Sequence, residues 1–134
     1  MQDRPKGAEL LAIARRTLVE KLTDLLPEER RGDASRIAEA MAIAAREIEA
    51  GERPLRAELE RLAALYGETP AEAGDREALE GEVTRLNRRL AADIRAGKFD
   101  SPDRRRAARA HLLASARDKL AESKPEHLKA RGLD

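Results

Sequence analysis

The chain has 134 residues, enough for one helical or mixed domain whose core needs neither metal nor disulfides. Apolar residues make up 41% of it but aromatic residues only 1%, and Ala is the commonest residue with 26 copies. The net charge of +1 selects no class of partner, and the absence of Cys excludes disulfides, thiol catalysis and zinc sites built on Cys.

The first amphipathic helix is predicted over residues 4–26. Asp3 can cap its N-terminus, and Pro5 suits its first turn because no backbone N–H is needed there. Pro27 ends the helix. Its apolar stripe follows helical spacing and consists of Leu11, Ala14, Leu18, Leu22 and Leu25.

The second helix is predicted over residues 34–50, after a turn at 28–32. Asp33 or Ser35 can cap it, and Gly51 is its stop. Its stripe has little bulk, so a neighbouring helix can approach closely; the stripe is Ile37, Met41, Ala44 and Ile48. A third helix is predicted over residues 54–67, with the stripe Leu55, Leu59, Leu62 and Tyr66.

Residues 67–76 are predicted to form a surface loop with at most one helical turn, because Gly74 interrupts a capping-box pattern. Two helices follow, over residues 76–96 and from a Ser101 cap to residue 122. Their stripes are Leu79, Val83, Leu86, Leu90 and Ile94, then Ala108, Leu112, Ala116 and Leu120. Pro125 opens a short last turn, and residues 129–134 are expected to fray.

This succession of helices predicts an all-α fold, a compact bundle of about five helices in a single domain over residues 1–134. β-branched residues are sparse, and no stretch alternates apolar and polar residues over a useful length. No segment approaches the ~18 apolar residues of a membrane span, and no signal-peptide pattern is visible. With no Cys in the chain, we expect a cytoplasmic protein.

Residues capable of catalysis show no recognisable arrangement. His111 and His127 are too far apart in sequence for a helical metal-ligand pair, which needs a spacing of about 3 or 4. A partly buried structural role is expected for His111, between Ala108 and Leu112. There is no glycine-rich phosphate loop. The sequence therefore predicts a protein that is not an enzyme and binds no metal or cofactor.

Basic residues concentrate in the segment 95–119, which holds 8 basic and 3 acidic side chains. Its cluster Arg104, Arg105, Arg106 and Arg109 begins a helix, where cations oppose the helix dipole. One interpretation is an anion-binding patch; the other is a solvated face paired with Asp100 and Asp103. Nucleic acid is not expected as a partner, because the chain has no aromatic platform for stacking bases.

Polar residues also border the apolar stripes. Asn87 and Asp93 lie beside the stripe of the fourth helix, and Arg46 and Glu47 border Ile48 in the second. Such residues can form a buried polar network that fixes helix register, or they can face a groove for a partner. Both interpretations stay open on the sequence.

Several short motifs together resemble a family of small bacterial helical proteins of formerly unknown function. The motifs cover most of the chain and are Met1–Pro5, Ala8–Leu11, Ala40–Glu47, Leu86–Arg88, Ile94–Gly97, Asp118–Ala121 and Pro125. Members of that family are encoded beside aminoglycoside-phosphotransferase-like kinases and acyl-CoA dehydrogenases. The family includes the small partner subunit of the hydroxyacyl-CoA kinase of levulinate catabolism.

The resemblance implies that this chain is a non-catalytic accessory subunit that binds and supports such a kinase. It marks eight residues as a contact surface or the polar core behind it: Asp3, Arg4, Pro5, Arg46, Glu47, Asn87, Arg95 and Lys119. Two alternatives stay open. One is a self-associating helical module, a homo-oligomer without a kinase partner. The other is a small anion- or nucleic-acid-binding protein that uses the basic segment 95–119.

Overall fold

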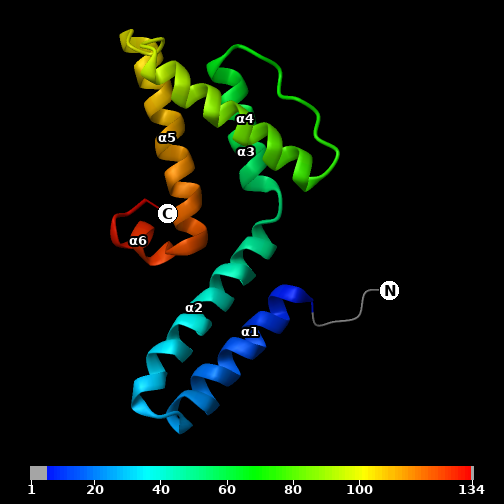
Figure 1. The fold of residues 1–134 in the computed structure, drawn as a ribbon, viewed down its shortest axis with the longest axis vertical. Helices are drawn as coiled ribbons and strands as arrows, with labels where there is room; N and C mark the ends of the chain where they lie inside the picture. Colours follow the sequence, from blue (N-terminus) through cyan, green and yellow to red (C-terminus); the bar gives the residue numbers. More distant parts are fainter. Residues whose placement is uncertain (1–5, 134) are drawn as a thin grey trace. The chain divides into compact units, whose positions relative to one another are not determined.

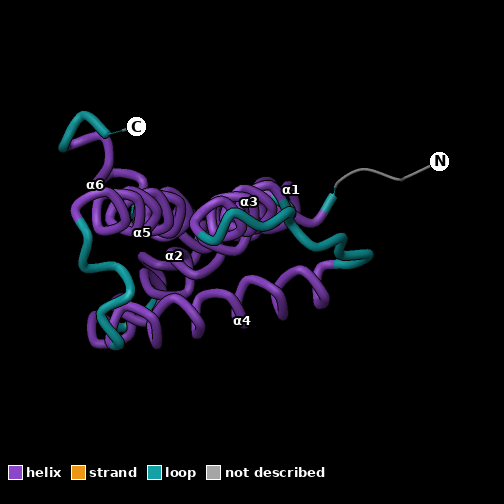
Figure 2. The backbone as a smooth tube through the Cα atoms, turned by 90° about the horizontal axis from the view of Figure 1, so that it is seen from above, coloured by secondary structure: helices purple, strands orange, loops and turns teal. Residues whose placement is uncertain are grey.

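The computed structural model describes residues 6–133, and within them the fold is all-α (Figures 1 and 2). Five helices exceed ten residues and a sixth has six, which confirms the predicted class and the predicted number of helices. The chain divides into two units, unit 1 up to Gly51 and unit 2 from Glu52 onward. No helix in the described part of the chain combines the length and apolarity needed to cross a bilayer.

Unit 1 is a helical hairpin. Helix α1 spans Gly7–Thr17 and packs against α2, which spans Glu28–Ala50 and runs the opposite way (Figure 1). The connection begins with a π-helical turn, η1 (Leu18–Leu22), and a 3-10 turn, η2 (Thr23–Leu25).

The helix predicted over residues 4–26 is therefore α-helical only from Gly7 to Thr17. The backbone N–H of Thr23 reaches back to the carbonyl oxygen of Leu18, five residues earlier. The Thr23 hydroxyl donates to the same oxygen at 2.8 Å, which holds the wider turn in place. The predicted Asp3 cap and Pro5 lie outside the described residues.

The second helix begins earlier than predicted, at Glu28 instead of residue 34. Pro27 precedes it with extended backbone. The negative side chains of Glu28 and Glu29 lie in the first turn, where they interact favourably with the positive end of the helix dipole. Asp33 and Ser35, predicted as caps, lie inside the helix, as does the supposed turn at 28–32. Gly32 also lies inside the helix, where a Gly lowers helix stability by about 1 kcal/mol relative to Ala. Packing of α2 against α1 outweighs this loss.

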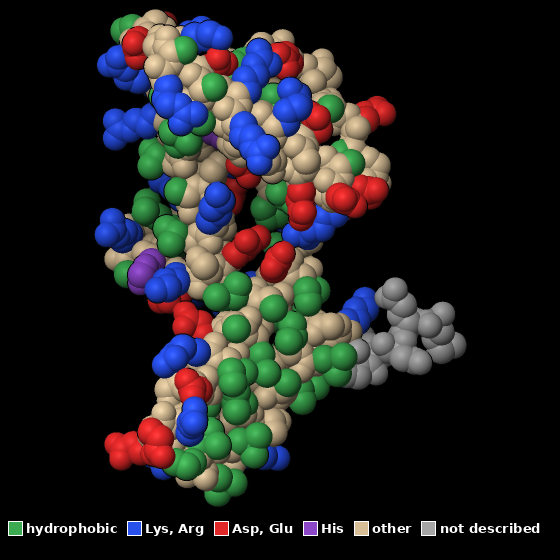
Figure 3. All heavy atoms as spheres, viewed as in Figure 1, with side chains coloured by type: hydrophobic (Ala, Val, Ile, Leu, Met, Phe, Trp, Pro, Cys, Tyr) green, Lys and Arg blue, Asp and Glu red, His purple; other side chains and the backbone are tan. Residues whose placement is uncertain are grey.

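Unit 1 buries very little apolar volume. Among its described residues Ala34 and Ala38 are the fully buried ones, and both are small. Much of the bulk of the two predicted stripes is exposed instead. The large aliphatic side chains that remain exposed in unit 1 are Leu10, Ile13, Val19, Leu22, Leu25, Ile37 and Ile48. Figure 3 shows hydrophobic side chains gathered on one face over both α1 and α2.

Unit 2 contains α3 (Arg53–Leu65), α4 (Arg76–Arg95), α5 (Pro102–Ser123) and α6 (Pro125–Ala130). Helix α3 packs against both α4 and α5, and α6 packs against α5. Residues 66–75 contain no helical turn, so the single turn allowed within the predicted loop is absent. The Asp75 carboxylate caps α4 by accepting from the N–H of Ala78 at 2.8 Å.

The C-terminal segment is more ordered than the predicted frayed tail. Residues 129 and 130 complete α6. The N–H groups of Gly132 and Leu133 then donate to the carbonyl oxygens of Lys129 and Leu128, which closes a turn after the helix. These bonds satisfy carbonyls that a helix end leaves without partners.

The core of unit 2 follows the predicted stripes closely. Its buried members are Leu59, Leu62, Leu79, Val83, Leu86, Leu90, Phe99 and Ala108. The predicted stripes fail in part: Ile94 is 40% exposed, Leu112 is 50% exposed, Ala116 is exposed and Leu120 is half-buried, so the stripe predicted for α5 is fully buried only at Ala108. Helix α5 turns Ala108 and His111 inward, and Leu112 lies one residue, or about 100°, further round the helix.

Candidate functional site

A polar cluster lies between the three long helices of unit 2, and Glu58 on α3 is its centre. The carboxylate accepts a hydrogen bond from Asn87 Nδ2 on α4 at 2.9 Å and one from Ser115 Oγ on α5 at 3.4 Å. Asn87 is half-buried and thus ties α4 to α3, as a polar residue that fixes helix register would. The sequence marked Asn87 but gave no signal for Glu58, because acidic residues are common on helix surfaces.

The same cluster continues one turn along α3. Arg61 Nη2 donates to the Asp118 carboxylate of α5 at 2.8 Å. His111 on α5 is only 3% exposed, and neither of its ring nitrogens has a hydrogen-bond partner among the described residues. Burial lowers the pKa of His111; the Glu58 carboxylate partly offsets this shift and the Arg61 guanidinium adds to it. The predicted structural role for His111 agrees with this position.

An open groove of about 350 Å³ lies beside this cluster, between α3, α4 and α5. Its apolar lining residues are Pro54, Leu55 and Val83. Its other lining residues are mostly charged: Glu58, Arg76, Glu80, Thr84, Ser115, Asp118, Lys119 and Glu122. The lining of the groove therefore combines apolar side chains with charged side chains of both signs.

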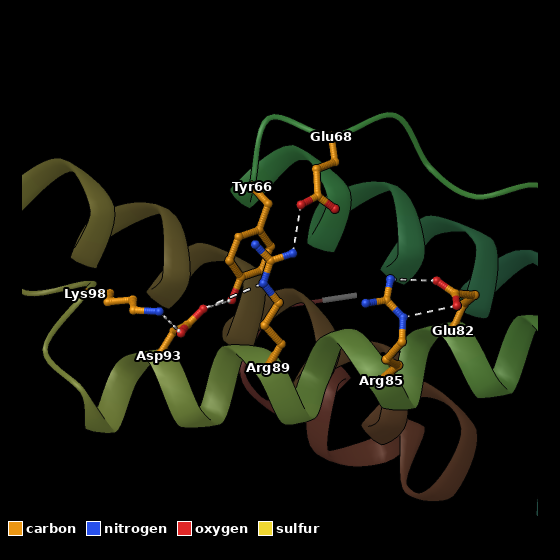
Figure 4. Close-up of polar contacts among 7 residues, drawn as sticks. All are labelled: Tyr66, Glu68, Glu82, Arg85, Arg89, Asp93 and Lys98. Carbon is orange, nitrogen blue, oxygen red and sulfur yellow. Dashed lines mark hydrogen bonds and ion pairs between the residues drawn. The ribbon is translucent and has the colours of Figure 1, made fainter.

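A second polar network joins the end of α3 to the α4–α5 turn (Figure 4). Asp93, 8% exposed, accepts hydrogen bonds from the Tyr66 hydroxyl at 2.9 Å and from Lys98 Nζ at 2.7 Å. The hydrogen bond from Lys98, with that from Tyr66, lowers the pKa of Asp93. Burial and the bond to Asp93 raise the pKa of Tyr66 to about 12.

Arg89 extends this network on the solvent side. Its guanidinium carbon lies 3.8 Å from the centre of the Tyr66 ring, and Nη1 donates to Glu68 at 2.7 Å (Figure 4). The Tyr66 ring in turn meets Phe99 edge-on, with 6.1 Å between ring centroids. Nearby on α4, Arg85 and Glu82 form an exposed pair within the helix (Figure 4). We assign the Asp93 network to holding the helix ends together.

Two arginines of the predicted anion patch, Arg104 and Arg105, bind backbone carbonyl groups nearby. Arg104 donates to the Lys98 carbonyl oxygen at 2.9 Å, and its guanidinium lies 4.9 Å from the centre of the Phe99 ring. Arg105 donates to the carbonyl oxygen of Asp100 at 3.0 Å. Exposed contacts of this kind contribute little individually, but they give these side chains a structural use.

Two further members of the patch lie on the open surface. Arg106 is 3.7 Å from the carboxylate of Asp103, and both side chains are exposed. Arg109 is exposed one turn further along α5. The predicted pairing with Asp100 and Asp103 is therefore present in part. Anion binding by the four arginines stays a prediction.

The residues marked by the family resemblance do not all come together. Asn87 and Lys119 meet the same groove, Asn87 through its bond to Glu58 and Lys119 as a lining residue. Arg95 is exposed at the last turn of α4, about 12 Å along the helix from Asn87 at 1.5 Å per residue. The remaining ones are in other parts of the chain: Arg46 and Glu47 belong to α2 of unit 1, and Asp3, Arg4 and Pro5 lie outside the described residues.

Comparison with known proteins gives one match. The family model described as Domain of unknown function (DUF6285) matches residues 24–127. The chain belongs to the DUF6285 family. The DUF6285 match begins in η2 and ends in α6, so it includes α2 and the three long helices of unit 2 but not α1. No curated protein and no solved structure matches the chain.

Residues 6–133, which the structure describes, contain no cluster suited to binding a metal ion. No three His, Asp or Glu side chains gather there in an arrangement that could hold a metal ion. The carboxylates of the polar cluster are used differently, since Glu58 accepts from Asn87 and Ser115, and Asp118 pairs with Arg61. What the groove offers is a shaped surface with mixed charge.

Proposed function

We propose that this protein is a non-catalytic accessory subunit that binds and supports an aminoglycoside-phosphotransferase-like kinase acting on hydroxyacyl-CoA in short-chain acid catabolism. The family resemblance of the sequence motifs supports the identity of the partner. The groove of unit 2 supports the mode of binding, and it is the observation on which the proposal rests.

The groove has the composition of a site that receives part of another protein. Protein interfaces combine apolar and polar side chains, and the lining of this groove contains both kinds. Lys119 and Arg76 offer cationic groups to a partner, and Glu80 and Glu122 offer carboxylates. A segment of the kinase with apolar and charged side chains would fit such a lining.

Support of the kinase would work through a shift in its conformational equilibrium. A subunit that binds the competent conformation more tightly than the other conformations raises the population of the competent one. It also stabilises the folded kinase by mass action. The polar cluster beneath the groove would keep α3, α4 and α5 in register, so that the surface is formed before the partner arrives.

Reconstitution with the kinase tests this proposal. We expect the chain to co-purify with it in near-equal amount and to raise its rate of phosphoryl transfer to hydroxyacyl-CoA. Lys119→Glu should weaken binding and reduce the rate increase, whereas Lys129→Glu, an exposed lysine on α6 outside the groove, should not. Equal binding by both variants, or a kinase rate that ignores the chain, would contradict the proposal.

The two alternatives differ in what supports them. The support for anion binding through the basic segment is weaker, because Arg104 and Arg105 already make structural contacts. If phosphate contacts drove binding, the affinity would fall steeply with salt concentration, so a salt titration distinguishes that alternative. Self-association has stronger support, namely the exposed apolar face of unit 1.

A further inference from the structure

The hairpin of unit 1 has the form of half a helical bundle. A helix must bury its apolar stripe against another element, and a hairpin whose buried residues are Ala34 and Ala38 meets this need only along the α1–α2 contact. Several of its larger side chains stay largely exposed: Leu25 is 79% exposed and Ile48 is 53% exposed. A layer of comparable size would complete the bundle.

Helix α2 carries an apolar stripe whose ends, Ile37 and Ile48, are about half-exposed and whose middle residues are partly buried. Ile37, Met41, Ala44 and Ile48 follow the spacing 4, 3, 4, which places them on one side of the helix. This stripe lies about 70° round the helix from the buried Ala34 and Ala38, at 100° per residue. It carries no charged side chain between residues 37 and 48.

Helix α1 adds exposed aliphatic side chains of its own. Leu10 and Ile13 are about half-exposed, and Figure 3 shows the apolar surface continuing across both helices. The π-helical turn η1 adds one residue to a turn, so it rotates the residues after it by about 100° relative to a continuous α-helix. That rotation moves Leu22 and Leu25 away from the α1–α2 contact, onto the side where Leu10 and Ile13 lie.

The area of this face is large for a chain of this size. Seven large aliphatic side chains about half-exposed offer on the order of 600 Å², at the upper end of the ~300–600 Å² found for the largest patch on a typical monomer. A standard interface buries about 800 Å² per partner, so this face and its rim suffice for one. The apolar face is defined here as Leu10, Ile13, Val19, Leu22, Leu25, Ile37 and Ile48.

We propose that the apolar face of unit 1 is the interface of a homodimer, in which two hairpins pack face to face as a four-helix bundle. The stripe on α2 is uncharged, so it carries no electrostatic feature that calls for a different, complementary partner. In a two-fold dimer the same patch serves both copies and covers both faces at once. Facing pairs of amphipathic helices are the usual core of four-helix bundles.

The dimer goes beyond the proposed kinase partnership and uses other residues. The groove is lined by residues of α3, α4 and α5, whereas the apolar face belongs to α1, α2 and their connection. The dimer is therefore tested on the purified chain alone. Failure of one proposal leaves the other standing.

Sedimentation equilibrium of the full chain measures the association directly. We expect twice the monomer mass of 14.8 kDa at micromolar concentration. Ile37→Glu buries two unpaired carboxylates per dimer and should raise the dissociation constant by roughly 100-fold or more. Ile13→Glu tests the other helix in the same way, and the milder Ile37→Ala should weaken the dimer roughly tenfold.

Leu112→Glu is the matched control, because Leu112 of α5 is 50% exposed and Ile37 is 49% exposed. This control should remain dimeric, and circular dichroism should show unchanged helix content in all variants. A monomeric wild-type chain would overturn the proposal and indicate that the chain's own unit 2 or another protein covers the face. A dimer that persists in both Glu variants would overturn it too, because it would use a different surface.

Discussion

Unit 1 and unit 2 are both built from amphipathic helices, but they bury the apolar sides of these helices to different extents. The core of unit 2 contains Leu62, Leu79 and Leu90, each almost completely buried. Unit 1 fully buries only Ala34 and Ala38 among its described residues and leaves seven large aliphatic side chains half-exposed or more. Periodicity in a sequence shows which side of a helix is apolar, but not whether the chain itself covers that side.

The polar contacts of the two units differ in a parallel way. In unit 2 they join separate helices, as between Asn87 and Glu58 or between Arg61 and Asp118. In unit 1, Asp33 pairs with Arg30 and Arg36, neighbours on the same helix. Contacts between helices fix register, whereas pairs within one helix add only about 0.2–0.5 kcal/mol to its stability. Unit 2 therefore has the more fully specified packing.

The largest expected effect comes from removing core volume in unit 2. Leu62→Ala should lower the free energy of unfolding by about 2–5 kcal/mol, because Leu62 is completely buried and its neighbours can collapse only in part. Urea unfolding followed by Tyr66 fluorescence measures this, since Tyr66 is the only Tyr and the chain has no Trp.

The matched change in unit 1 is Leu25→Ala, at a residue that is 79% exposed. In monomeric chain this change should cost no more than about 0.5 kcal/mol. A loss as large as that of Leu62→Ala would mean that Leu25 is buried in the folded chain. The contrast between the two units would then disappear.

A pH effect of intermediate size is expected from His111. In the unfolded chain its pKa lies near 6.5, and burial lowers it in the folded protein. Between those two pKa values the unfolded state binds an extra proton, so stability falls as the pH falls below about 6.5. The slope from one proton is at most about 1.4 kcal/mol per pH unit. Chemical denaturation at a series of pH values between 7 and 5 measures it.

His111→Gln should remove this part of the slope, because Gln has no titrating group. His127 provides the comparison: it is exposed on α6, so His127→Gln should leave the slope unchanged. An unchanged slope in His111→Gln would show that His111 takes up its proton without loss of stability, for instance by pairing with Glu58.

Much of unit 2 was predictable because residues typical of helix ends mark its helices and because most of its apolar stripes are buried. Pro102 after Ser101 marks the start of α5, and the stripe from Leu79 to Leu90 is buried as the spacing predicts. The early start of α2 was missed because Gly32 and a run of charged residues resembled a turn. Helix formation there depends on packing against α1, which local sequence does not report.

The candidate site was predictable only in part, for a physical reason. Asn87 stands out in sequence because a polar residue beside an apolar stripe is unusual. Its partner Glu58 does not, since only the approach of α3 to α4 gives that carboxylate its role. The basic cluster drew attention by composition, yet Arg104 is used to close the α4–α5 turn. The roles of these residues depend on contacts between helices, which cannot be recognised from the local sequence.

Two glycines in open space are expected to give modest effects of opposite sign. Gly51 ends α2 at φ 61° and ψ −136°, a conformation that residues with a side chain rarely adopt. Gly51→Ala should therefore destabilise by about 1–2 kcal/mol, although an added Cβ meets no atom within 4 Å. The cost is conformational and not steric.

Gly81 lies inside α4, and an added Cβ there also meets nothing within 4 Å. Gly81→Ala should stabilise by up to about 1 kcal/mol, because Ala loses less backbone entropy in a helix. Thermal unfolding of the two variants by circular dichroism gives both signs in one experiment. If Gly51→Ala were neutral, the end of α2 would not need the left-handed backbone, and the boundary between unit 1 and unit 2 would tolerate a continuous helix.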